Sequence, residues 1–399
     1  MYTLIQAKWT PTAYDRWIDT IGTKWVLTDN TVSPDLVAAK VAQSFFHISL
    51  QSASKHFNGY GMQDGIDVNN TMAHLRNTKT NNQVSYQYVA ALETIMAGAC
   101  WPASRIHAIK PSVPNLCPRC NMHEEDSLHT FWTCPHNRLI EESAVQNSQY
   151  LIDEAVSSAT DEPCLWLRGI LPSHHMNISD EYTPSDTLKI YHEFSQSCRQ
   201  EQDIVWDSGL YYGDASGGVY TQYAELRRVG VGLTKFHNGT FHSGIHCNLP
   251  GTVQTVGRGE LFALLVLARS LNPSSNVEFV TDNQNVQINF DKGEIACALT
   301  NNADLYKELF MHIKNQQLSI KVRWMPSHLK DGVKVRPCDT SDIDIEGNDK
   351  ADGLAETAAK FLKVPDHAAK KYIRHANLVK TIQKRLATIL MYLPKREKS

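Results

Sequence analysis

The fold and the chemistry of this sequence are decided by the stretch Leu210-Tyr211-Tyr212-Gly213-Asp214-Ala215-Ser216-Gly217-Gly218. Its apolar and aromatic start predicts a strand, and the Gly-Gly pair at its end predicts a turn. A buried aspartate at a strand end costs free energy unless a cation pairs with it. Asp214 therefore either caps the turn or belongs to a group of carboxylates that holds a hard divalent cation. The stretch alone favours the turn cap, and only the downstream sequence favours the cation site.

Strand and helix patterns alternate after this stretch, and His237-Asn238-Gly239 is typical of a hairpin turn. Further strands are predicted at 227–236, 240–248, 276–282 and 318–325. Helices are predicted at 257–271 and at 346–362. Further helical segments are predicted between the strand at 276–282 and residue 315. This order predicts an α/β fold in which helices cover a mixed sheet.

Four acidic residues stand where such a sheet gathers its functional groups, near the carboxyl ends of the strands. Asp214 and Asp282 each end a predicted strand. Glu260 lies in the first turns of the helix between them, and Asp352 lies in the first turns of the last helix. Converging carboxylates repel one another, and two Mg²⁺ ions roughly 4 Å apart would remove this repulsion. Because such an ion pair activates water for attack on phosphorus, the predicted reaction is phosphodiester hydrolysis.

Five successive motifs over about 208–362 resemble those of type I ribonuclease H. They are Tyr212-Gly213-Asp214-Ala215-Ser216-Gly217-Gly218, Gly259-Glu260-Leu261, Thr281-Asp282-Asn283, Met325-Pro326-Ser327-His328 and Gly347-Asn348-Asp349-Lys350-Ala351-Asp352-Gly353-Leu354-Ala355. The resemblance implies a ribonuclease H-like mixed five-stranded sheet with flanking helices, and an enzyme that hydrolyses the RNA strand of RNA–DNA hybrids. It implies that Asp214, Glu260, Asp282 and Asp352 hold two Mg²⁺ (or Mn²⁺) ions. It also implies that His328 is a mobile helper in proton transfer or product release.

The loop between His328 and the last motif is longer than the resemblance would suggest. It adds acids that compete for the role of fourth ligand, namely Asp331, Asp339, Asp342, Asp344 and Glu346. Asp349 is the main rival of Asp352. Asp352 is preferred because the Gly-Leu-Ala run after it keeps a helical register that buries Leu354 and Ala355. For His328, an exposed loop histidine without a catalytic role is the alternative.

Four residues next to the acids are candidates for substrate contact. Ser216 and Gly217 would bring backbone amides close to the minor groove of a hybrid, where 2′-hydroxyls distinguish RNA from DNA. Asn283 and Gln284 would form hydrogen bonds with bases or sugars. Turn formation by the first pair and helix capping by the second are equally good interpretations.

A second metal pattern precedes this region, with the spacing Cys-x2-Cys-x8-His-x4-Cys. The predicted ligands are Cys117, Cys120, His129 and Cys134. This set suits tetrahedral Zn²⁺, and the predicted role of the ion is structural because so small a segment has little apolar mass of its own. His123 and His136 are rivals of the ligand histidine, and unrelated cysteine pairs are the alternative to a zinc site.

The sequence is predicted to contain five segments. They are a helical, thumb-like remnant at 1–112, a zinc-binding region at 113–140, a helical connector at 141–204, a ribonuclease H domain at 205–362 and a basic helical tail at 363–399. The zinc pattern, with Trp101-Pro102 before it, resembles the region after the polymerase domain in reverse transcriptases of non-LTR retrotransposons. The order of segments resembles the C-terminal part of such a polyprotein. The sequence has no aromatic-x-Asp-Asp run, which excludes a polymerase palm.

The tail at 363–399 combines Lys and Arg residues with apolar residues at helical spacing, which predicts an amphipathic basic helix. Phosphate contact by the basic face and packing of a solvated helix on the domain are equally good interpretations.

Composition adds expectations about location. The net charge of −3 carries no information about partners, so any nucleic-acid surface must be local. No apolar segment is long enough to span a membrane, and nine cysteines occur without a signal-peptide pattern. An intracellular protein of the nucleus or cytoplasm, neither secreted nor bound in a membrane, is expected.

Two functions fit these observations. The first is an active Mg²⁺-dependent ribonuclease with an RNA–DNA hybrid as its partner. The second is a catalytically inactive ribonuclease H-fold module that binds nucleic acid or protein. The presence of all four acids favours the first, because random decay of a retroelement fragment would remove at least one.

Overall fold

The computed structural model describes residues 2–28, 34–81, 84–195, 206–327, 329, 336–338 and 340–394. The chain divides into two compact units. The helical unit comprises Met1–Asn177 and Lys370–Ser399, and the sheet unit comprises Ile178–Ala369. Each unit is described by itself, and the predicted boundaries at 112, 140, 204 and 362 stay predictions.

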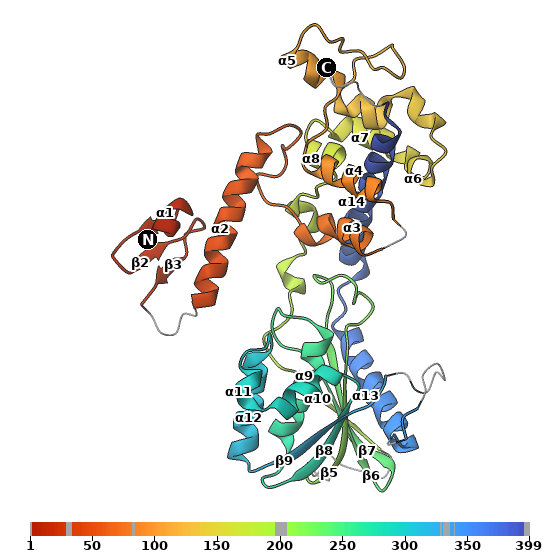
Figure 1. Ribbon diagram of the computed structural model, residues 1–399. Coiled ribbons are helices and arrows are strands. Elements are labelled where there is room, and N and C mark those ends of the chain that lie inside the picture. Colours follow the sequence, from red (N-terminus) through yellow and green to blue (C-terminus); the bar gives the residue numbers. More distant parts are fainter. Residues whose placement is uncertain are drawn as a thin grey trace. The chain divides into compact units, whose positions relative to one another are not determined.

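The sheet unit is built on a mixed six-stranded sheet with the order β4-β7-β6-β5-β8-β9 (Figure 1). The strands are β4 (Ile190–Phe194), β5 (Gly209–Ser216), β6 (Gly230–His237), β7 (Thr240–Asn248), β8 (Asn276–Thr281) and β9 (Ser319–Trp324). β5 pairs with β6 in antiparallel and with β8 in parallel orientation. β8 in turn pairs in parallel with β9. The prediction of a mixed α/β fold is confirmed, and the stretch that carries Asp214 lies in the middle of the sheet.

The predicted count of five strands is wrong, because β4 adds a sixth. This strand lies in the segment predicted as a helical connector, and it pairs antiparallel with β7 from Ile190↔Cys247 to Phe194↔Ser243. An unpaired β7 would present a row of free backbone donors and acceptors, and β4 satisfies them. Glu193 of β4 also forms a salt bridge with Lys350. Tertiary pairing therefore overrides the weak local helical pattern.

Helices cover both faces of this sheet (Figure 1). They are α9 (Val256–Ser270), α10 (Gln284–Lys292), α11 (Glu294–Cys297), α12 (Ala303–Asn315) and α13 (Asp342–Phe361), with the short 3₁₀ helix η5 (Asp180–Tyr182) before β4. α9 is almost entirely buried and forms the centre of the main core together with β5, β6 and β8. α13 packs on the opposite face of the sheet.

α13 approaches β6 closely because the contact positions of β6 are glycines. A Cβ on Gly232 would collide with the backbone of Ala351, and a Cβ on Gly230 would collide with the backbone of Ala355. Val231, the residue between these two glycines, points to the other face of the sheet and lies beside Gly259 of α9. The first turn of α9 and the middle turns of α13 thus lie close to the carboxyl end of β5, on opposite faces of the sheet.

The helical unit contains the remaining helices. They are α1 (Tyr2–Gln6), α2 (Pro34–Ser54), α3 (Val68–Thr80), α4 (Tyr86–Met96), α5 (Ala103–Ile109), α6 (Ser143–Gln146), α7 (Ile152–Ser158), α8 (Pro163–Arg168) and most of α14 (Asp366–Tyr392). Four short helices complete it: the π-helix η1 (His129–Thr133) and the 3₁₀ helices η2 (Pro135–Leu139), η3 (Gln149–Leu151) and η4 (Ser173–Met176). Within the described residues, no helix is both long enough and apolar enough to cross a bilayer.

The structure near the N-terminus differs from the prediction of a helical segment at 1–112. A three-stranded sheet forms there from β1 (Thr10–Pro11), β2 (Arg16–Ile18) and β3 (Lys24–Val26). The side chains of Trp9, Trp17 and Trp25 are buried together. The carboxylate of Asp19 accepts hydrogen bonds from the backbone of Ile21 and Thr23 and from the Trp25 indole, which holds the turn between β2 and β3. Regular spacing of the tryptophans was the signal for this sheet that the helical interpretation overlooked.

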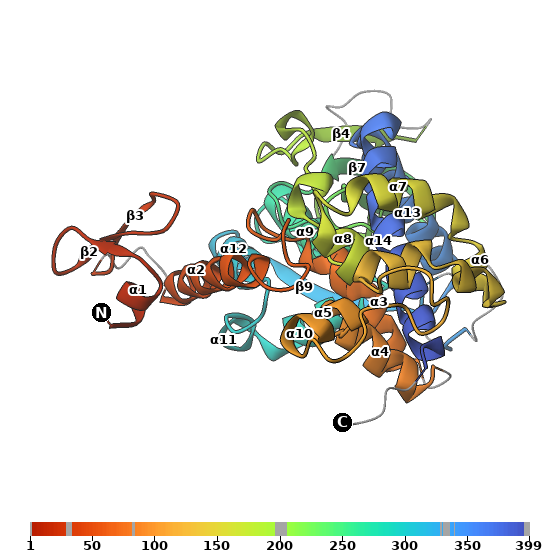
Figure 2. The ribbon, with the colours of Figure 1, turned by 90° about the horizontal axis from the view of Figure 1, so that it is seen from above.

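α14 forms where the sequence predicts an amphipathic basic helix, and it runs among α3, α4, α7 and α8 in both views (Figures 1 and 2). Its apolar face is buried, including Ile382, Leu386 and Ile389. Arg385 is 0% exposed and donates hydrogen bonds to the carbonyl oxygens of Phe131 and Val145. The lysines of the opposite face are exposed, so the helix packs and still presents a basic surface.

Candidate active site and metal centres

Asp214, Glu260 and Asp282 meet at one end of the sheet. Each offers a carboxylate oxygen, and these oxygens lie within 4.8 Å of one another. The parallel pairing explains the meeting of the two aspartates: Tyr212 pairs with Val280, so two residues further along both strands Asp214 lies beside Asp282. Residues far apart in the sequence therefore form one acidic group through strand register.

Glu260 reaches this group because α9 begins close to β5. The helix is capped by Thr255, whose hydroxyl accepts a hydrogen bond from the backbone of Arg258. Gly259 lies against Ala215 of β5, where a side chain would not fit. Thr281, at the end of β8, donates a hydrogen bond to Oε2 of Glu260 at 3.5 Å. These contacts aim the carboxylate at the two aspartates.

The three acids line a cavity with parts of α13. Its other lining residues include Ser327, Leu329, Ile345, Asn348, Asp349 and Asp352. Asp349 and Asp352 both reach the cavity, so the lining alone does not choose between them. The negative charge of Asp352 is among the causes that raise the pKa of Asp214, so these two carboxylates interact, and the preference for Asp352 over Asp349 stays a prediction.

Burial and mutual repulsion disfavour the ionised state of this group. Burial is the main cause that raises the pKa of Asp214 well above its usual range, and the charges of Asp282, Glu260 and Asp352 add to it. Burial, followed by the charge of Asp282, raises the pKa of Glu260 to about 8, against hydrogen bonds from Asn283 and Thr281. A bound cation would favour the charged carboxylates and remove this cost.

The residues present fit Mg²⁺. All the charged donors are carboxylates, and hard divalent cations prefer oxygen ligands. Oδ1 of Asn348, which lines the same cavity, is buried without a hydrogen-bond partner in the described part of the chain. An ordered water or a bound ion would satisfy a buried oxygen acceptor of this kind.

The other predicted site residues have local structural roles. Ser216 ends β5, and its hydroxyl accepts a hydrogen bond from the backbone of Gly218. Gly217 packs against Thr221, and the side chain of Asn283 caps α10, whose first residue is Gln284. Turn formation and helix capping therefore occur, and substrate contact by these residues stays a prediction. His328 lies outside the described residues.

Asp344 is an important residue whose role the sequence interpretation missed. Among the competing loop acids, Asp331 and Asp339 lie outside the described residues, and Asp342 pairs with Arg336. Asp344 is buried and forms a capping box with Ser341 at the start of α13. Oδ1 of Asp344 also accepts a hydrogen bond from Arg323 at 2.6 Å. This acid therefore supports α13 instead of competing for a cation, and the Ser-x-x-Asp spacing was the available signal.

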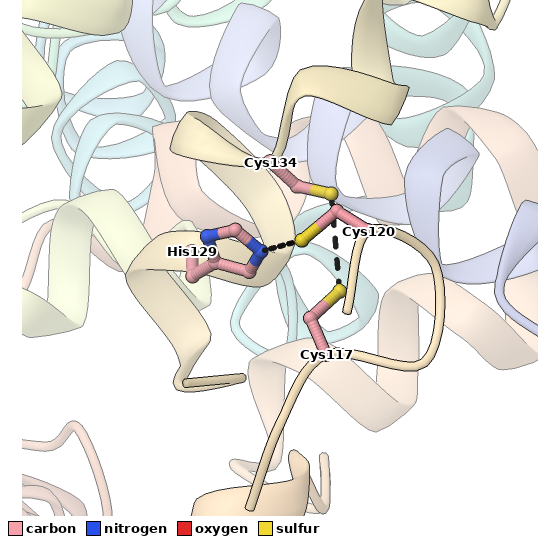
Figure 3. A group of neighbouring side chains, drawn as sticks. All are labelled: Cys117, Cys120, His129 and Cys134. Atoms are coloured by element: carbon pink, nitrogen blue, oxygen red, sulfur yellow. Dashed lines mark hydrogen bonds between the residues drawn. The ribbon is translucent and has the colours of Figure 1, made fainter. Parts of the chain in front are cut away.

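The predicted zinc ligands Cys117, Cys120, His129 and Cys134 form a second group in the helical unit (Figure 3). The Sγ atoms of Cys117 and Cys134 are 3.9 Å apart, and Sγ of Cys120 is 3.4 Å from Nε2 of His129. Two Zn–S bonds of about 2.3 Å at a tetrahedral angle would place the sulfur atoms about 3.8 Å apart, so the donor set fits Zn²⁺. Within the described residues, the rivals His123 and His136 are not part of this group.

No protein-family model matches this chain, and no curated protein matches it. The solution structure of the PFV RNase H domain matches 39% of this chain and 95% of that domain, with 17% identity and a TM-score of 0.30. RNase H1 from the halophilic archaeon Halobacterium salinarum matches 38% of this chain and 97% of its own, with 16% identity and a TM-score of 0.27. The foamy viral protease-reverse transcriptase in complex with RNA/DNA hybrid matches 42% of this chain but only 22% of its own, with 14% identity and a TM-score of 0.31. The structural neighbours are thus RNase H domains at low identity.

Proposed function

We propose that the sheet unit is a Mg²⁺-dependent nuclease that hydrolyses the RNA strand of RNA–DNA hybrids. The observation that carries the proposal is the meeting of Asp214, Glu260 and Asp282 within 4.8 Å, in a cavity where burial raises the pKa of Asp214 and Glu260. Acids are costly in this arrangement unless cations occupy it, so a metal function explains why they are there. The motif order that resembles type I ribonuclease H supports the same reaction.

In this proposal, the residues of the chain hold and orient the reacting groups. Asp214, Glu260 and Asp282 are the main ligands, and Asp352 completes the set from α13. Two Mg²⁺ ions held there would supply the charge that activates a water and stabilises the leaving oxygen. Asn348 would orient a water or a phosphate oxygen from the floor of the cavity. His328 would assist proton transfer or product release from the adjacent loop.

The choice of the RNA strand is the finer part of the proposal. It is supported by the position of Ser216 and Gly217 at the carboxyl end of β5, next to the acids. Their backbone amides would contact 2′-hydroxyls across the wide minor groove of the hybrid. Asn283 and Gln284, at the start of α10, would contact the same duplex.

The surrounding chain supports a retroelement origin as a further proposal. A zinc-binding region before a ribonuclease H-like unit resembles the C-terminal part of a non-LTR retrotransposon polyprotein. The Zn²⁺ would stabilise the helical unit, and the nuclease would act inside the cell, in the nucleus or cytoplasm.

The test is cleavage of a hybrid by the full chain. A duplex with one labelled RNA strand is incubated with the protein and Mg²⁺, alongside duplexes of DNA and of RNA alone. Cleavage of the RNA strand in the hybrid only is expected. The Asp282→Asn variant should lose cleavage and keep hybrid binding, whereas Asp291→Asn, which alters an exposed acid of α10, should cleave normally. Binding by the wild type without any Mg²⁺-dependent cleavage would instead identify a catalytically inactive nucleic-acid-binding module.

A further inference from the structure

Glu162, His174 and His175 form a separate group of metal-binding side chains in the helical unit. One ligand atom from each lies within 4.8 Å of the others. Glu162 directly precedes α8, and the two histidines lie in η4. The group shares no residue with the Cys/His cluster or with the acidic cavity, and neither of those sites explains it.

The two histidines converge on one carboxylate. Nε2 of His174 is 2.9 Å and Nε2 of His175 is 2.8 Å from the same oxygen, Oε1 of Glu162. The imidazole rings lie side by side, with centroids 4.2 Å apart and planes inclined by 39°. Neighbouring residues of a short helix ordinarily point in different directions. Here both ring nitrogens face one carboxylate oxygen, so three atoms that can bind a metal ion are gathered in one place.

A third histidine supports this arrangement from α14. The ring of His375 stacks on the ring of His175, with centroids 4.6 Å apart. Nδ1 of His375 is 2.9 Å from the carbonyl oxygen of Lys371, and since a carbonyl only accepts, Nδ1 carries the proton and donates. The stack fixes the plane of His175, as the neighbours of metal ligands commonly do.

The group is open on one side. The side chain of His174 is 55% exposed, whereas those of His175 and Glu162 are 19% and 21% exposed. An ion bound between the three side chains could therefore keep a water molecule as its remaining ligand.

We propose that Glu162, His174 and His175 bind one divalent transition-metal ion, with Zn²⁺ as the expected occupant. Two imidazole nitrogens and one carboxylate oxygen are ligands that Zn²⁺, Co²⁺ and Ni²⁺ accept and that Mg²⁺ does not favour. Each histidine nitrogen needs to move away from Oε1 of Glu162 by only about 0.5 Å to reach the separation set by zinc bonds at a tetrahedral angle. His375 is a positioning residue, and it does not coordinate the ion.

The test counts zinc ions in the full chain, prepared without a histidine tag. The protein is loaded with Zn²⁺, freed from unbound metal by gel filtration and analysed by mass spectrometry of its metals. The His174→Ala/His175→Ala variant should hold one zinc ion fewer than the wild type. The control His56→Gln, which alters an exposed histidine of the same unit, should hold as many as the wild type.

Cobalt loading provides an internal check on folding. Co²⁺ at the Cys/His cluster gives a thiolate charge-transfer band, and this band should be equal in the wild type and in the double variant. The proposal is wrong if both proteins bind the same number of zinc ions while the thiolate band stays intact. Should the double variant lose that band, His174→Gln, which alters the exposed ligand only, is compared with the wild type by zinc-indicator competition. Equal affinities in that assay would also overturn the proposal.

The role of His375 is tested by the same competition assay. His375→Ala should weaken zinc binding about 10-fold, as loss of the support behind a ligand does. His375→Phe keeps a ring against His175 and should restore most of the affinity. An equal loss of zinc affinity in the two variants would show that stacking of residue 375 on His175 does not support zinc binding.

Discussion

The hydroxyl of Tyr212 donates a hydrogen bond to Oδ1 of Asp344 at 3.0 Å in the core of the sheet unit. Tyr212 precedes Asp214 on β5 by two residues, and Asp344 begins the helix that carries Asp352. Arg323 of β9 pairs with the same carboxylate and with Glu278 of β8. This buried network therefore joins the strand and the helix that contribute acids to the candidate site.

Removal of Asp344 should be much more harmful than removal of the Tyr212 hydroxyl. Asp344→Ala removes the buried carboxylate that accepts hydrogen bonds from Arg323 and Tyr212, leaves Arg323 with Glu278 alone, and should cost about 3 kcal/mol of unfolding free energy. Tyr212→Phe keeps the ion pair and should cost about 1 kcal/mol. Urea denaturation of both variants measures the difference. Similar losses of unfolding free energy in the two variants would contradict the central position of Asp344 in the network. Asp342→Asn, which alters an exposed ion pair two residues before Asp344, is the matched control.

The stability of the protein without Mg²⁺ should fall as the pH rises from about 4.5 to about 8. The pKa of Glu260 is raised in the folded state, so the unfolded chain loses this proton first and binds fewer protons in that window. The unfolding free energy then decreases with increasing pH. Millimolar Mg²⁺ should reduce the decrease, because a bound cation favours the charged carboxylates.

Denaturant unfolding at several pH values checks this dependence. Glu260→Gln cannot ionise and should show a weaker decrease than the wild type under the same conditions. The variant and the wild type contain the same Cys/His cluster. Protonation of its ligands at low pH therefore changes the stability of both proteins equally and does not affect the difference between them. A wild-type stability that rises with pH relative to the variant would refute the raised pKa.

Loss of Zn²⁺ should loosen α14 as well as the cysteine cluster. Arg385 of α14 donates a hydrogen bond to the carbonyl oxygen of Phe131, in the π-helix that carries His129. An ion bound by the Cys/His cluster would stabilise that π-helix, and the π-helix provides the acceptor for the buried guanidinium of Arg385. Hydrogen exchange of the Cys120→Ser variant should therefore rise around 117–134 and around 382–389. Unchanged protection of α14 would show that the helix packs independently of the zinc region.

The exposed lysines of α14 should contribute to nucleic-acid binding through phosphates. Lys370, Lys380 and Lys384 are exposed on this helix. Their replacement by Gln should lower hybrid affinity and reduce the slope of log K against log salt by up to about 0.9 for each lost contact. A variant with Lys8, Lys24 and Lys55 replaced by Gln carries the same change in charge elsewhere in the helical unit. Equal slopes of log K against log salt in the two variants would show that the basic face of α14 does not contact phosphates and is only a solvated surface.

Local patterns were sufficient for the main elements of the sheet unit. The strand before Asp214, the helix after Gly257 and the last helix before Leu362 form close to their predicted positions. Alternation and helical spacing decide these elements because each buries one apolar face in the core. The edge strand β4 and the small N-terminal sheet were missed, because pairing with distant or neighbouring strands stabilises them more than their own residue pattern does.

The candidate sites follow the same division. Sequence alone determined which residue types could hold metal ions and at which strand and helix ends the acids stand. Only the tertiary structure decided that Asp214, Glu260 and Asp282 share one cavity, that Asp344 supports α13, and that Glu162 meets His174 and His175. The physical reason is that strand register and helix packing set distances between side chains, and both depend on contacts between residues far apart in the chain.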